Sequence, residues 1–251
     1  MIKAPFITQL DVLDLSLSWV SLQDEGVARL VASKHLQGLR GLALRGHGIS
    51  AAGAKAIAGS RHLTRLQRLD LSGNRIGAAG AKAIAASTRL NQLEELNLSQ
   101  TELTLAGLKA IVNSPARSNL RSLSLTHNTL GTDGAHVLAS ASAVTKLHSL
   151  EVCFNDLDDD GLVALAQSAN ARELRSLDID GAKIDKPGAQ ALVALPQLGQ
   201  LIVGEGLRKP MLKTLHARLG AGLMVRRSTQ RGALEVVSYE GIGEGGYCLH
   251  P

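Results

Sequence analysis

The sequence predicts an α/β solenoid, a curved arc in which a parallel sheet lines the concave face and helices cover the convex face. Two markers that recur every 27 residues predict this fold class. The first is an L-x-x-L-x-L pattern, whose seven copies begin at Val12, Leu39, Leu66, Leu93, Leu120, Leu147 and Leu174. The second is a glycine in constant phase, found at Gly26, Gly53, Gly80, Gly107, Gly134, Gly161 and Gly188.

Each unit is expected to hold a short strand, a turn and a helix, because its apolar period changes from 2 to about 3.6 along the unit. The predicted strands start near residues 14, 41, 68, 95, 122, 149 and 176. Small residues such as Ala81 and Ala83 let neighbouring helices approach closely. One unit cannot bury its apolar face alone, so the units stack, and the wider helices curve the array with the strands inside.

The regular array is expected to end after a shortened unit. An eighth copy of the pattern starts at Leu198, three places earlier than the period requires, and Pro196 and Gly204 lie where the regularity fails. Residues 1–206 are therefore predicted to form the array, with seven full repeats from residue 12 and a short eighth.

Residues 207–251 are predicted to form a C-terminal capping segment that covers the apolar face of the last repeat. Its expected elements are a helix at 211–219, a strand near 223–225, a strand at 233–239 and a flexible glycine-rich tail. At the other end, the segment 1–11 is too short for a full cap. The chain could therefore be part of a longer protein, or a partner could lie at that end.

The third unit, LQRLDLSGNRIGAAGAKAIA from Leu66 to Ala85, resembles the leucine-rich repeat family, specifically its ribonuclease-inhibitor-like class. The GAKAIA and GAQALV segments are similar to the GALA-type repeats of bacterial proteins. The resemblance covers about residues 12–219 and implies the curved fold and a protein-binding role.

In that family an asparagine ladder bonds the turns that follow the strands. The matching asparagines here are Asn74, Asn128 and Asn155. The residues that depart from the pattern are Val20, His47, Thr101 and Ala182. We expect locally looser turns at these four departures.

Composition limits the classes of protein that the chain could represent. Hydrophobic residues make up 45% of the 251 residues and aromatic residues only 2%, so the core is expected to be aliphatic. Cys153 and Cys248 are too few for a disulfide framework and suit free thiols in a reducing compartment. No apolar run reaches the roughly 18 residues of a membrane span. We expect a cytoplasmic monomer, or alternatively a secreted effector whose signal is not readable.

The net charge of +5 is unevenly distributed along the chain. Residues 1–119 carry a net +6, residues 120–206 a net −5 and residues 207–251 a net +4. Sequence-tolerant binding of single-stranded nucleic acid requires aromatic stacking platforms, which are almost absent here. A nucleic-acid partner is therefore not expected, and binding through the basic N-terminal band is kept as the weaker alternative.

Two motifs match parts of known metal-binding or cofactor-binding motifs, and neither match is complete. The run from Asp156 to Gly161 matches the first half of a calcium loop, but the twelfth position is Gln167 in place of a bidentate acid. These acids are expected to cap a helix. The G-x-G-x-x-G at 241–246 has no helix after it, since only five residues remain. We therefore expect no metal and no cofactor.

A catalytic role is also not expected. His127 and Cys153 fall on neighbouring repeats, so a nucleophile and base pair is conceivable, but no orienting acid or oxyanion feature accompanies them. We expect a surface thiol beside an unrelated histidine. No HExxH, P-loop or GxSxG motif is present.

The remaining candidate is the outward side of the strands, which lies on the concave face. Small polar residues fill its middle rows, and carboxylates with one exposed aromatic gather at repeats six to eight. The predicted partner-binding residues are His127, Glu151, Phe154, Asp178, Asp180 and Glu205. An exposed aromatic beside acids suits a protein partner with a basic surface, although such residues also occur as ordinary solvated surface. On the convex face, Lys55, Lys82 and Lys109 are interpreted as helix solvation.

The sequence thus predicts a non-catalytic protein-interaction scaffold that binds its partner on the concave face. The alternative is a substrate-recruiting module of a larger enzyme, as in ubiquitin-ligase-type bacterial effectors.

Overall fold

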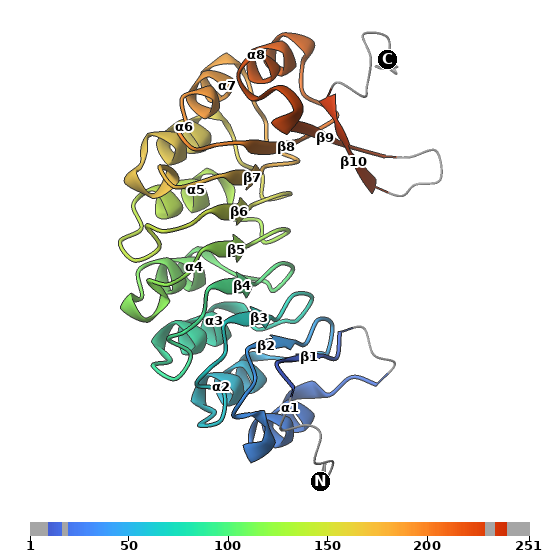
Figure 1. The fold of residues 1–251 in the computed structure, drawn as a ribbon, viewed down its shortest axis with the longest axis vertical. Helices are drawn as coiled ribbons and strands as arrows, with labels where there is room; N and C mark the ends of the chain where they lie inside the picture. Colours follow the sequence, from blue (N-terminus) through green and yellow to red (C-terminus); the bar gives the residue numbers. More distant parts are fainter. Residues whose placement is uncertain (1–9, 17–19, 229–233, 240–251) are drawn as a thin grey trace.

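The computed structural model describes residues 10–16, 20–228 and 234–239. Its strands form one ten-stranded sheet in sequence order, β1 to β10. Figure 1 shows an arc with the strands on the inner side, the helices on the outer side and the strands β1 and β10 at opposite ends of the arc. The predicted α/β solenoid is therefore confirmed.

The strands in chain order are β1 (Val12–Asp14), β2 (Gly41–Ala43), β3 (Arg68–Asp70), β4 (Glu95–Asn97), β5 (Ser122–Ser124), β6 (Ser149–Glu151), β7 (Ser176–Asp178), β8 (Gln200–Gly204), β9 (Leu223–Ser228) and β10 (Leu234–Ser238). The helices are α1 (Gln23–Val31), α2 (Ala51–Gly59), α3 (Gly77–Ala86), α4 (Leu105–Val112), α5 (Gly131–Ala139), α6 (Asp159–Gln167), α7 (Lys186–Val193) and α8 (Lys209–Leu219). Strands β2 to β7 start at the predicted residues.

The register between the strands of the regular repeats follows the period of the sequence, and the first strand departs from it. Leu42 pairs with Leu69, and Leu69 with Leu96, so each partner lies one full period further along the chain. Leu13 pairs with Leu42, which lies two places beyond one period. The first apolar triplet is thus Leu10, Leu13 and Leu15, and the predicted triplet starting at Val12 is wrong. A shift of two residues preserves the alternation of a strand, so both assignments satisfy the pattern.

The core is aliphatic and continuous along the arc. The central leucines of β2 to β7 are at most 2% exposed, and the inner faces of the helices pack against them. The repeat glycines let the helices touch. A Cβ on Gly80 would lie 3.0 Å from the Cβ of Ala54, and one on Gly107 would lie 3.1 Å from the Cβ of Ala81. These glycines therefore fit the close packing between successive helices.

The asparagine ladder is present, and histidine and threonine continue it. Asn74 donates through Nδ2 to the Leu44 carbonyl at 2.8 Å and accepts from the Ile49 amide at 3.0 Å. His47 does the same one repeat earlier, since its Nε2 lies 2.6 Å from the Leu15 carbonyl and its Nδ1 accepts from the Leu22 amide.

Thr101 donates to the Leu98 carbonyl at 2.6 Å, and its amide donates to Asn128 Oδ1. His47 and Thr101 are 1% and 0% exposed. The expectation of looser turns at these two residues is therefore wrong, because both side chains take up ladder hydrogen bonds. By the observed register, Val20 is not a ladder position; the ladder position of the first repeat is Ser18, outside the described residues.

A second polar ladder lies at the other edge of the array. Three serines each donate a hydroxyl hydrogen bond of 2.5–2.6 Å to a carbonyl near the end of the helix in the preceding repeat: Ser60 to Val31, Ser87 to Ala58 and Ser114 to Ala85. These carbonyls have no partner within their own helix. The serines therefore join each repeat to the one before it.

The last elements extend the sheet beyond the repeats. Helix α8 begins two residues before the predicted 211–219 helix, β9 pairs parallel with β8, and β10 pairs antiparallel with β9. The sheet thus runs without a break across residue 206, and the division at 206/207 stays a prediction. The predicted tail, the glycine motif at 241–246 and Cys248 lie outside the described residues.

Candidate functional site

His127 and Phe154 form a stacked pair at the edge of the concave face. Each is the third residue after its strand, β5 or β6, and their ring centroids lie 4.5 Å apart with planes inclined by 12°. The His127 amide donates to the Cys153 carbonyl, and the Phe154 amide donates to the Asp180 carbonyl. His127 is exposed and Phe154 is half-buried. The structure therefore brings these two predicted binding residues together as one flat surface.

The backbone under this pair is left-handed, with φ of 56° at His127 and 51° at Phe154. Equivalent places in other repeats hold Gly46, Gly73 and Gly181, which adopt such angles without strain. A side chain here costs roughly 1–2 kcal/mol. Large rings at a place suited to glycine make the pair a candidate for contact with a ligand or partner.

Asp178 and Asp180 are not free surface carboxylates. Arg226 on β9 donates to Asp178 Oδ2 at 2.5 Å and to Asp180 Oδ2 at 3.2 Å. The two aspartates are 4% and 7% exposed. The expectation that both face solvent is wrong, because the arginine of β9 covers and neutralises them. Glu151 and Glu205 are exposed, as expected.

Cys153 lies beneath this ion-paired group. It is 2% exposed, and Arg226 Nη1 lies 3.4 Å from its sulfur. Burial and the nearby Asp178 raise the pKa of the thiol to about 12. The expectation of a surface thiol is wrong, and a neutral thiol in this position is a poor nucleophile at physiological pH.

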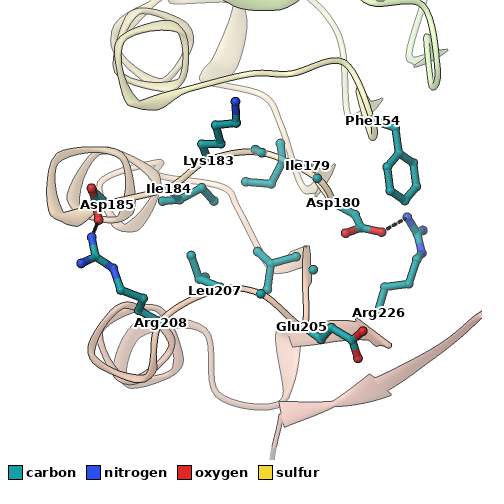
Figure 2. A pocket seen from close by; sticks show the side chains of 15 residues that line it. Phe154, Ile179, Asp180, Lys183, Ile184, Asp185, Glu205, Leu207, Arg208 and Arg226 are labelled. Carbon is teal, nitrogen blue, oxygen red and sulfur yellow. Dashed lines mark hydrogen bonds and ion pairs between the residues drawn. The ribbon is translucent and has the colours of Figure 1, made fainter. Parts of the chain in front are cut away.

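A hollow of about 460 Å³ opens beside these residues, between the turns that follow β7 and β8 (Figure 2). Ala182 lies in its wall, at the place where other repeats carry a ladder side chain. Asp185 and Arg208 form an ion pair at one end, and Asp180 and Arg226 form another at the opposite end. The lining thus carries charges of both signs, most of them paired within the protein.

A second hollow of about 320 Å³ follows the outward faces of β1 to β6. Its carboxylates are Asp14, Asp70, Glu95 and Glu151, and its cation is Arg68. Ser124 donates to Glu151 Oε2 at 2.8 Å, which holds that carboxylate over the sheet. We call this surface the acidic groove.

Sequence reasoning missed Asp14 and Glu95 as members of the acidic groove. The two-residue shift at the first strand kept Asp14 outward, but it placed Asp14 one residue before the predicted central leucine, Leu15, whereas the structure pairs Asp14 with Ala43. Glu95 lies one place before the central leucine of its strand, so the outward alternation along the strand could have found it.

The acidic run at 156–160 caps helices. Asp158 accepts from the Gly161 amide at 3.1 Å, and this bond is the largest cause that lowers its pKa. Asp159 accepts from the amides of Asp185 and Gly188 in the next repeat. Within the described residues, no group of three or more His, Cys, Asp or Glu side chains is arranged to hold a metal ion. In the same part of the chain, no helix has the length and apolar character needed to cross a bilayer.

Comparison with known proteins supports the repeat assignment. A sequence model of the family described as "Leucine Rich repeat" matches residues 60–85, 90–112, 117–139, 145–166 and 171–193. A search of curated proteins found no match.

Among solved structures, a protein of Bacteroides fragilis superposes with a TM-score of 0.54 and 14% identity, over 88% of this chain and 67% of that chain. A chain from the Rad7 and Elc1 complex of yeast superposes with a TM-score of 0.41 and 14% identity, over 94% of this chain and 80% of that one. The ten-stranded sheet, the side-chain ladders and the five matched repeats together show that the chain has the leucine-rich repeat fold.

Proposed function

We propose that this protein is a non-catalytic scaffold that binds a partner protein with a basic surface on its concave face. Leucine-rich repeat domains are generally protein-interaction modules. The period of the repeats further leads us to place them in the ribonuclease-inhibitor-like class, with similarity to bacterial GALA-type repeats. The observation that carries the proposal is the acidic groove on an otherwise basic protein.

Charge favours a basic partner for this face. The acidic groove has four carboxylates and one arginine, whereas the whole chain carries a net +5. Carboxylates kept together on a rigid sheet attract a cationic surface and speed its approach. Because Asp178 and Asp180 are paired with Arg226, the negative charge that a partner would meet on this face comes mainly from the carboxylates of the acidic groove.

The aromatic pair offers the apolar centre of the proposed interface. Phe154 follows Glu151 by three residues, so the ring and the carboxylate lie at the same end of β6. Aromatic side chains that become desolvated on binding often dominate interface energy, while surrounding charges affect the association rate. We therefore retain His127, Glu151, Phe154 and Glu205 as binding residues and assign Asp178 and Asp180 a positioning role.

The test is quantitative affinity capture from the source organism, followed by binding kinetics with each purified candidate partner. The double variant Glu95→Gln, Glu151→Gln should slow association and flatten its dependence on salt. Phe154→Gly should speed dissociation without loss of folding, since glycine suits the left-handed backbone there. Gln100→Gly, at the same place one repeat before His127, is the matched control and should bind as wild type.

Lys55→Gln with Lys82→Gln is the control for the convex face, where both lysines are exposed. The concave assignment fails if these lysine changes abolish binding while the glutamate and phenylalanine variants bind as wild type.

A further inference from the structure

The connections that lead from each helix to the next strand gather cations along one edge of the sheet. Between α1 and β8, these connections carry nine exposed lysines and arginines and two carboxylates, Glu94 and Glu173. The cations are Lys34, Arg40, Arg61, Arg65, Arg89, Arg121, Lys146, Arg172 and Arg175. We call them the basic edge. The charges come from six connections, so the edge extends along most of the array.

The opposite edge of the same sheet has a different character. In the described parts of the turns that lead from strands to helices, six carboxylates accompany four cations. The excess of positive charge therefore belongs to one edge and does not follow from the basic composition alone. Among the described residues, Arg40 is the one member of the basic edge that forms an ion pair. Its Nε lies 4.0 Å from Oδ1 of Asp11, which is exposed.

A hollow of about 410 Å³ lies within the basic edge and is lined by hydrogen-bond donors. Its residues are Arg40, Thr64, Arg65, Gln67 and Gln92. No carboxylate is among them, so an oxyanion could receive hydrogen bonds from two guanidinium groups and from neutral side chains. Planar guanidinium groups bind phosphate oxygens in a bidentate manner. The side chains of the hollow thus have the chemistry of a phosphate-binding site.

Other side chains of the edge narrow the class of polyanion. The connections contain no phenylalanine, tyrosine or tryptophan, so single-stranded bases have no platform to stack on. The exposed large hydrophobic residues of the described chain are Val12, Val20, Leu105 and Val236, and none lies on these connections. Nothing apolar there would enter a bilayer.

The length of the edge suits a duplex. The first and last of the six connections precede β2 and β7, which are five strand spacings apart, or about 24 Å. A duplex carries one charge per roughly 1.7 Å of axis, so a segment of this length presents enough phosphates for nine cations.

We propose that the basic edge binds the phosphate backbone of a nucleic-acid duplex without reading its sequence. This inference is independent of the acidic groove, which is lined mainly by residues of the strands and carries the opposite charge. The scarcity of aromatic residues still argues against binding of single-stranded nucleic acid by base stacking. It does not argue against contacts to the phosphate backbone, because these do not use stacking.

The test is fluorescence anisotropy of the full chain with a labelled 20-base-pair DNA duplex and an RNA duplex of the same sequence, between 50 and 200 mM salt. With about five phosphate contacts, affinity should fall about 500-fold over this range. Arg40→Gln with Arg65→Gln should make the log–log salt slope shallower by about two. The matched control, Lys55→Gln with Lys82→Gln, removes the same charge from the convex face and should leave the slope unchanged.

Several outcomes would overturn the proposal. They are no duplex binding with a dissociation constant below about 100 μM at 50 mM salt, an equal change of slope in the two double variants, and tighter binding of a single strand than of either duplex. Displacement of the duplex by phosphatidylserine vesicles at equal phosphate concentration would assign the edge to a membrane surface instead.

Discussion

Arg226 Nη2 lies 2.5 Å from Asp178 Oδ2, although 48 residues separate the two in sequence. Asp178 ends β7 and Arg226 belongs to β9, so the guanidinium reaches across β8. Gly204 on β8 leaves room for Asp180, the second carboxylate that Arg226 contacts, since a Cβ there would collide with Asp180 Oδ1. One side chain therefore ties the last parallel strand to the seventh repeat.

The ion-paired group predicts a large effect of removing the arginine. Arg226→Ala leaves two buried carboxylates without their cation, and we expect it to lower the free energy of unfolding by about 3–5 kcal/mol. Urea unfolding followed by circular dichroism measures this change. Arg227→Ala is the matched control, because its ion pair with Glu235 is partly exposed and is worth at most about 1 kcal/mol.

Neutralising the carboxylates should rescue the variant. Adding Asp178→Asn and Asp180→Asn to Arg226→Ala should recover part of the lost stability. No recovery, or equal losses in Arg226→Ala and Arg227→Ala, would show that the buried ion pairs do not hold β9 to the array.

Arg117 occupies a place that is leucine in the preceding repeats, and it is 0% exposed. Its Nη2 donates to the Ser87 carbonyl at 2.6 Å, while its Nε and Nη1 have no partner among the described residues. Burial lowers its pKa to about 10, so it is still charged at neutral pH.

We expect Arg117→Leu to raise the free energy of unfolding by about 1–3 kcal/mol, since it removes unsatisfied buried donors. The reverse change at the equivalent place, Leu90→Arg, should destabilise the protein. Chemical unfolding of both variants measures the difference, and a loss of stability in Arg117→Leu would contradict the interpretation.

Leu98 points into the core and its neighbour Ser99 points outward, so we expect their substitutions to lower the free energy of unfolding by different amounts. Leu98 is 0% exposed, and Leu98→Ala should cost about 2–5 kcal/mol from lost burial and the cavity left behind. Ser99→Ala removes a hydroxyl contact of 2.7 Å to Ser124 and should cost about 0.5–1.5 kcal/mol. Equal losses in urea unfolding would mean that the phase is wrong.

Cys153 should resist alkylation while the protein is folded. Its thiol is buried and its pKa is raised to about 12, whereas the reactive species is the exposed thiolate. Iodoacetamide at pH 8, followed by peptide mass mapping, should leave Cys153 unmodified in buffer and modify it in denaturing urea. Rapid labelling of Cys153 in buffer would contradict the buried placement. Mapping by peptide keeps this result separate from that of Cys248.

The repeat period predicted most of the fold because neighbouring repeats contact each other in the same way along the array. Leu42, Leu69 and Leu96 share one environment, so the same pattern recurs at a constant interval. The first strand was misplaced because alternation survives a shift of two residues. The backbone register with β2, which depends on packing, decides between the two positions.

The candidate site was predicted less well. Outward positions follow from alternation, so Glu151 and the pairing of His127 with Phe154 on adjacent repeats could be anticipated. The burial of Asp178 and Cys153 could not, because Arg226 comes from a strand that lies outside the seven regular repeats.

The sequence by itself determined the architecture of this protein: the period sets the stacking of the units, and the alternation within each strand sets the buried and the outward faces. Tertiary structure alone decided which outward carboxylates stay in solvent and where the charged surfaces lie. The physical reason is that periodic residues meet the same neighbour in every repeat. A contact that crosses an intervening strand, such as that of Asp178 with Arg226, follows no period and depends on how the array ends.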